Sequence, residues 1–92
     1  MERREPWTYS LIEMRDAVAA SVDGRFRLVR AFRTIGDRGD LDYSVFAYLP
    51  DDMAGAEVAS AEYSAYRALE AIGCNIDHVE VILLTNMPTA LL

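Results

Sequence analysis

The sequence predicts a two-layer α+β sandwich of order (β)αββαβ, either ferredoxin-like or a three-stranded variant, with both helices on one sheet face. Three observations indicate this fold: two segments with helical spacing of apolar residues, three segments with strand-like alternation, and a glycine-bounded turn between two of those strands. The chain of 92 residues is predicted to form a single domain, residues 1–92, because too little sequence remains for a second core.

The first helix is expected to begin near Ser10. Ser10 and Glu13 fit a capping box, in which each side chain satisfies a free backbone N–H group at the helix start. Apolar residues then recur at helical spacing until Asp23 and Gly24, which end the run. Residues 7–9 alternate before this helix, and they could form a short edge strand or only pack against the helix.

The remaining elements follow from alternation and from turn residues. Residues 26–35 and 41–49 are predicted to be strands of a hairpin, joined by the turn at residues 36–39. A second helix is expected from about residue 51 to residue 72, because an apolar and alanine-rich stripe follows two acids that suit a helix start. Residues 78–85 alternate again and form the last predicted strand.

A tight hairpin turn sets the predicted register. It places Arg33 opposite Asp42 and Arg27 opposite Tyr48, both favourable cross-strand pairs, and it turns Arg30 toward the helices. The face that no helix covers is then predicted to carry a mixture of large apolar side chains and arginine, namely Arg27, Val29, Arg33, Phe46, Tyr48, Ile82 and Leu84.

Charge is segregated along the chain. Residues 25–38 contain five arginines and one acid, whereas residues 40–80 contain nine carboxylates and one arginine. The formal net charge is −6, which argues against general binding of nucleic acid because phosphate attraction requires a basic surface.

Other features limit the location and the chemistry. The start of the chain lacks an apolar signal core, and the longest strongly apolar run covers only residues 81–84, so we expect a cytoplasmic protein without a membrane segment. The single cysteine, Cys74, cannot form an intramolecular disulfide or a multi-cysteine metal site. His78 has no nearby companion ligands in the sequence, so no metal and no cofactor are expected.

Arg27, Arg33, Phe46 and Tyr48 form the predicted binding site. Arginine beside exposed aromatic side chains is typical of interfaces. We place a homodimer interface first, a solvated strand face second, a pocket for an anionic or aromatic ligand third, and an RNA-stacking platform last because of the net charge.

The sequence therefore predicts a small non-enzymatic interaction or regulatory module. It would homodimerise through the open sheet face and bind a protein partner or an anionic metabolite. The alternative is a cofactor-free enzyme of the dimeric ferredoxin-like type with a pocket between sheet and helices, in which Arg27 or Arg33 holds substrate charge and Tyr48 or His78 transfers protons. The sequence identifies neither a catalytic residue nor the partner, and it leaves open whether residues 87–92 pack on their own domain or on a second chain.

Overall fold

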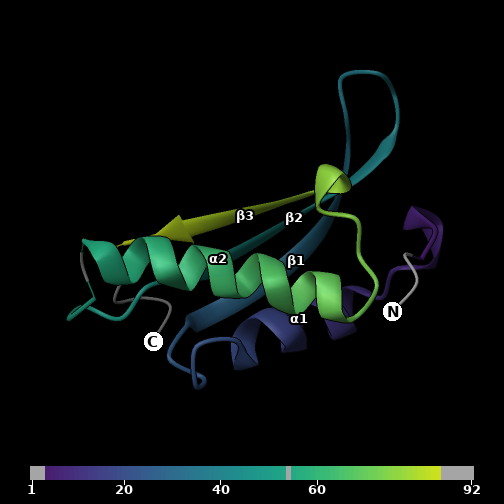
Figure 1. Ribbon diagram of the computed structural model, residues 1–92. Coiled ribbons are helices and arrows are strands. Elements are labelled where there is room, and N and C mark those ends of the chain that lie inside the picture. Colours follow the sequence, from purple (N-terminus) through teal and green to yellow (C-terminus); the bar gives the residue numbers. More distant parts are fainter. Residues whose placement is uncertain (1–3, 54, 86–92) are drawn as a thin grey trace.

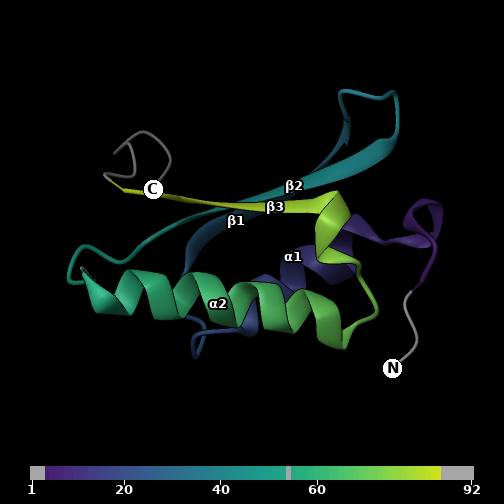
Figure 2. The ribbon, with the colours of Figure 1, turned by 45° about the horizontal axis from the view of Figure 1, so that its top comes forward.

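Two helices cover one face of a three-stranded sheet, and among the described residues no helix covers the other face (Figure 2). The computed structural model describes residues 4–53 and 55–85. The elements in chain order are η1 (Pro6–Thr8), α1 (Leu11–Ala20), β1 (Arg27–Ile35), β2 (Leu41–Tyr48), α2 (Ala56–Ala71), η2 (Ile76–His78) and β3 (Val79–Leu84). The question of how residues 87–92 pack lies outside the described residues.

The sheet is mixed and has the strand order β1-β2-β3 (Figure 1). β2 pairs with β1 antiparallel and with β3 parallel. The predicted α+β class with two helices and three strands is therefore confirmed. The alternative that residues 7–9 form a first strand is wrong, because a short 3-10 helix begins there at Pro6. Without that strand between them, β2 and β3 pair directly, so the β-α-β unit of the described residues is not split as in a ferredoxin-like sheet.

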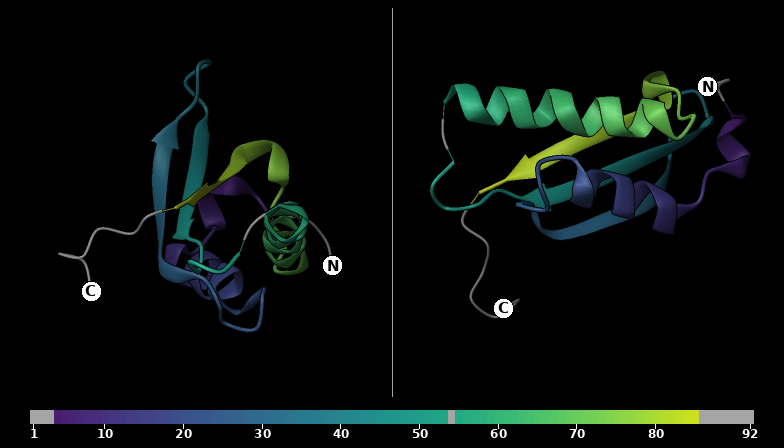
Figure 3. Two further views of the ribbon diagram at one scale, coloured as in Figure 1. Left: turned by 90° about the vertical axis from the view of Figure 1, so that its left-hand side faces the viewer. Right: turned by 60° about the horizontal axis from the view of Figure 1, so that its bottom comes forward.

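The core lies between the sheet and the helices, as the end-on view shows (Figure 3). Every second residue of β2 and β3 points into it, which is the burial pattern of a strand with one covered face. Its largest fully buried side chains are Tyr43, Met14, Leu69, Val18 and Val45. Core side chains therefore fill the space between the sheet and the helices.

The predicted hairpin register is wrong by one residue over most of its length. Ile35 pairs with Leu41 rather than with residue 40, because the loop contains five residues instead of four. The register changes between Arg27 and Arg30, where β1 has a bulge and Leu28 has a φ of +49°. Beyond the bulge, toward Arg27, the predicted pairing of Arg27 with Tyr48 is confirmed.

The five-residue loop changes the face on which several β1 side chains lie, and the bulge restores the predicted face at Arg27. Val29, predicted to be uncovered, is buried in the core. Arg30, predicted to point toward the helices, instead pairs with Phe46 on the uncovered face. Arg33 pairs with the buried Tyr43 and so belongs to the helix side of the sheet, where the hairpin extends beyond the helices and leaves it exposed (Figure 1).

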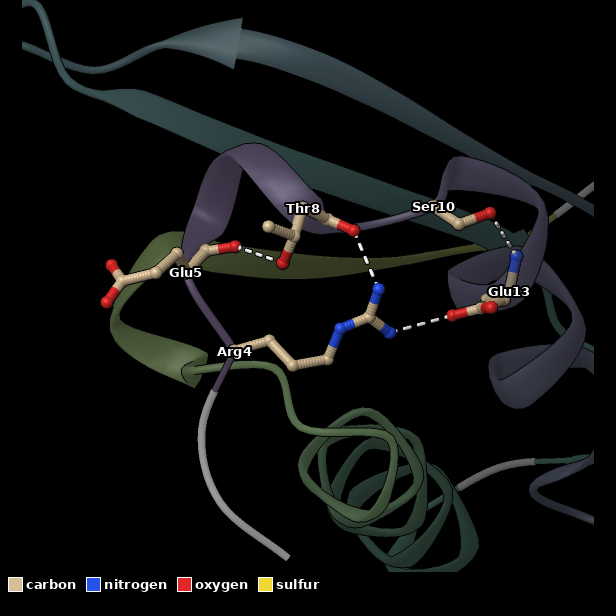
Figure 4. Close-up of polar contacts among 5 residues, drawn as sticks. All are labelled: Arg4, Glu5, Thr8, Ser10 and Glu13. Carbon is tan, nitrogen blue, oxygen red and sulfur yellow. Dashed lines mark hydrogen bonds and ion pairs between the residues drawn. The ribbon is translucent and has the colours of Figure 1, made fainter.

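The N-terminal segment is fastened to the start of α1 (Figure 4). The Arg4 guanidinium lies 2.8 Å from the Glu13 carboxylate and donates a hydrogen bond to the Thr8 carbonyl at 2.7 Å. The Ser10 hydroxyl accepts from the Glu13 N–H, which confirms one half of the predicted capping box. The Glu13 carboxylate binds Arg4, and this contact raises the pKa of the guanidinium above its usual value.

Two tyrosines join the N-terminal segment to the sheet and to the loop after α2. The rings of Tyr9 and Tyr43 lie 5.1 Å apart, and the Tyr43 hydroxyl donates to the Pro6 carbonyl. The Tyr9 hydroxyl accepts from the Asn75 N–H at 2.7 Å. Because Asn75 caps η2, these contacts fix the segment that carries His78.

The outer edge of β3 has a specific contact with α2. The backbone N–H of Val81 donates to the hydroxyl of Tyr66 at 2.9 Å. An edge strand normally offers such N–H groups to an added strand. Tyr66 occupies this one from within the chain.

Candidate functional site: the open sheet face

The open face is the sheet surface that neither helix covers. It carries an aromatic cluster of three side chains from two strands. The rings of Phe32 and Phe46 are stacked with centroids 5.5 Å apart, and Phe46 meets Tyr48 edge-on at 6.3 Å. By strand register, the face consists of Arg27, Arg30, Phe32, Thr34, Asp42, Ser44, Phe46, Tyr48, Glu80, Ile82 and Leu84.

The cluster remains accessible to solvent. Phe32 is 48% exposed and Ile82 is 37% exposed, and they lie on the two outer strands of the sheet. Phe46 and Tyr48 fill the middle strand between them. Large apolar side chains that adjoin across three strands form a patch, which is a stronger sign of an interface than isolated exposed residues.

The structure brings together only part of the predicted binding site. Phe46 and Tyr48 lie side by side on the open face. Arg27 pairs with Tyr48, and its guanidinium lies 3.7 Å from the Asp51 carboxylate. Arg33 belongs to the other face of the sheet, so it does not join these three residues.

Sequence reasoning missed two large side chains of the open face, Arg30 and Phe32. Strict alternation from the hairpin turn assigns both to the core side. The signal that could have corrected this is the loop length: with five residues, 36–40, in the loop, the same alternation places Arg30 and Phe32 on the open face.

A histidine–aspartate pair lies where β2 and β3 begin. His78 Nδ1 is 3.0 Å from Asp42 Oδ1, and each side chain is about one third exposed. The predicted pairing of Asp42 with Arg33 is therefore wrong, since Asp42 faces Thr34 across the hairpin. The Asn75 side chain accepts the Asp77 N–H and so sets the short helix that presents His78.

The His78 ring lines two shallow cavities. One has a volume of about 250 Å³ and is also lined by Asp42, Ser44 and Glu80. The other, of about 330 Å³, is also lined by the exposed Trp7. Among the described residues, no hydrogen bond joins Ser44 to the ring, so these side chains do not form a serine–histidine–aspartate triad.

Gly36 makes a close approach to this pair. A Cβ atom at Gly36 would lie 2.3 Å from Asp42 Oδ2, which forces the carboxylate to move. We expect Gly36→Ala to break the His78–Asp42 hydrogen bond while the sheet stays folded, because the clash involves the end of a side chain. Nitrogen-15 NMR of the His78 ring would measure the loss. Gly39→Ala is the control for a disturbed turn, because a Cβ there meets no atom within 4 Å and strains only the backbone, whose φ is +79°. An unchanged ring spectrum in Gly36→Ala would contradict the contact.

Other candidate groups give no reactive centre. Cys74 is buried, and burial raises the pKa of its thiol, which disfavours the nucleophilic thiolate. Within residues 4–53 and 55–85, no three metal-ligating side chains gather at one point. His78 ends η2 beside the start of β2, whereas Tyr48 is the last residue of β2, and neither of the two cavities that His78 lines reaches Tyr48.

Comparison with models of known protein families, with curated proteins and with solved structures finds no match. Among the described residues, no helix combines the length and the apolar character that crossing a membrane requires. The site is therefore interpreted from its own residues.

Proposed function

We propose that this protein is a small non-enzymatic interaction module that homodimerises through its open face. The observation that carries the proposal is the uncovered cluster of Phe32, Phe46 and Tyr48. Burying such rings against a second surface is favourable, and aromatic side chains with arginine are enriched at protein interfaces. Binding of a further protein partner or an anionic metabolite belongs to the same proposal, as does a cytoplasmic location.

Face-to-face packing is favoured over edge-to-edge pairing. At the β3 edge, the Val81 N–H already has a partner in Tyr66. At the β1 edge, the bulge next to Leu28 interrupts the regular spacing that an added strand needs. Within the described ranges, no comparable feature protects the open face.

The test is the association state of a double variant, Phe32→Ser with Phe46→Ser. We expect the native chain to dimerise in sedimentation and light-scattering measurements, and we expect the variant to bind itself at least about tenfold more weakly. Both replaced side chains are partly exposed on a face without core contacts, so circular dichroism should show a folded monomer.

The matched control is Ile12→Ser. Ile12 is 63% exposed but lies on α1, away from the open face, so its removal should leave association unchanged. A native chain that stays monomeric at high concentration would overturn the proposal, as would a double variant that dimerises as well as the native chain.

A second candidate function is acid–base catalysis, which the His78–Asp42 hydrogen bond favours. A carboxylate on Nδ1 holds the imidazole in one orientation, as a proton-transfer group requires. The site would use the cavities beside His78 rather than a pocket between the layers. NMR titration of the His78 ring with a small-molecule fragment library tests it: binding that Asp42→Asn weakens would support the function, and a ring that no fragment perturbs would count against it.

A further inference from the structure

We propose that the partner surface for the open face is the open face of a second copy, in a two-fold arrangement that sets Arg30 of each chain against Glu80 of the other. This inference rests on the proposed dimer and adds the partner, the symmetry and the contacts that select it. It is carried by the charge pattern of the face itself.

The two charged residues lie on the two outer strands of the sheet, on either side of β2. Arg30 is on β1 beside Phe46, and Glu80 is on β3 beside Ser44. Neighbouring strands are about 4.8 Å apart, so the two positions are about 10 Å apart across the sheet. Along the strands they are offset by two residues, the distance from Ser44 to Phe46. The centre of the face, between Ser44 and Phe46, lies midway between them.

A two-fold rotation can stack two such faces so that Arg30 and Glu80 exchange places. Its axis lies in the plane of the interface, passes through the centre of the face and is perpendicular to the line from Arg30 to Glu80, so the strands of the two copies cross at an angle. Each Arg30 then meets the Glu80 of the second copy, and this contact occurs twice because the interface is isologous. The aromatic rings of the two copies meet between these charges.

Both charges are available for this role. Arg30 and Glu80 are exposed, and neither forms an ion pair with any residue in the described ranges 4–53 and 55–85. The Arg30 guanidinium makes one hydrogen bond, to the Val29 carbonyl beside it, and its other donors remain available. The acidic side also includes Asp42, which adds negative potential near Glu80 because both line one cavity.

The dimer is expected to be weak and reversible. Three strands and about six residues give a face of roughly 14 Å by 20 Å in plan. This is small beside the ~800 Å² per partner of a standard interface. Measurements must therefore cover high protein concentrations.

The experiment is a charge exchange across the interface. Arg30→Glu alone places two pairs of like charges in the homodimer, and so does Glu80→Arg alone, so we expect each to weaken self-association about tenfold. An equimolar mixture of the two single variants restores both attractive pairs, and we expect it to form a heterodimer of native strength. The double variant that carries both changes should also dimerise as the native chain does.

Failure of this inference is distinguishable from failure of the proposed function. In one outcome, the double variant Phe32→Ser with Phe46→Ser weakens dimerisation while the charge exchange has no effect. That result would support the open-face dimer and overturn the two-fold contact of Arg30 with Glu80. Single variants that weaken association without rescue in the mixture would also overturn it. Arg33→Glu is the matched control. It makes the same charge change on the same strand but on the other face of the sheet, so it should leave self-association unchanged. A native chain that is monomeric throughout would overturn both proposals.

Discussion

Replacing Tyr43 with alanine is expected to lower the free energy of unfolding by about 3–5 kcal/mol, the usual cost of deleting a large buried aromatic side chain. Tyr43 is 1% exposed and packs on Tyr9, so the deletion leaves a cavity where the N-terminal segment meets the sheet. A small domain has only about 5–15 kcal/mol of stability in total. Thermal and urea unfolding followed by circular dichroism would measure the loss.

Tyr43→Phe separates the ring from its hydroxyl. The phenylalanine ring keeps the packing and loses only the hydrogen bond to the Pro6 carbonyl, so the expected cost is about 1 kcal/mol. Equal losses in the two variants would show that the hydroxyl, rather than the packing, dominates at this position. A loss below about 1 kcal/mol in Tyr43→Ala would contradict the buried position itself.

Leu69→Ala is expected to have an effect of similar size, about 2–5 kcal/mol. Leu69 has no exposed surface and lies on the α2 stripe that faces the sheet, together with Ala61 and Ala65. The two alanines are small and cannot fill the space that the leucine leaves. A 92-residue domain should lose roughly 4–8 °C in melting temperature per kcal/mol.

The control for this variant is Ile12→Ala, which removes an aliphatic side chain of the same size from the surface of α1. Ile12 is 63% exposed, so its loss should change stability by less than about 0.5 kcal/mol. Similar melting temperatures for Leu69→Ala and Ile12→Ala would mean that α2 does not pack on the sheet through this stripe.

The sequence allowed a correct prediction of both helices and of the faces of β2 and β3. In these strands the side-chain period of two continues without interruption, so Val45 and Val81 point to the core and Phe46 and Ile82 do not. The start of α2 was predicted some residues too early. Asp51 and Asp52, which suited a helix start, lie in a turn, and the helix begins later at Ala56, with Gly55 as its N-cap.

The faces of β1 could not be predicted from alternation. A five-residue loop shifts the register by one residue, and the bulge at Leu28 shifts it back. The two shifts cancel at Arg27, so the hydrophobic periodicity of the sequence indicates neither of them. A left-handed φ at a leucine is held by its surroundings rather than by local preference.

The His78–Asp42 contact was also beyond sequence reasoning. The two residues are 36 positions apart. They meet because β3 pairs directly with β2, whereas a split arrangement would place another strand between them. The contact thus depends on the tertiary order of the strands, which a single sequence did not determine.

The Tyr66 hydroxyl on the Val81 N–H has a consequence for how large an assembly can grow. Strand addition at a sheet edge is a head-to-tail contact, which leaves a fresh edge after each step and can continue into fibres. A two-fold contact through the open face uses the same surface on both copies and is complete at two. By occupying the edge amide, the Tyr66 hydroxyl disfavours an open-ended polymer and is consistent with the proposed closed pair.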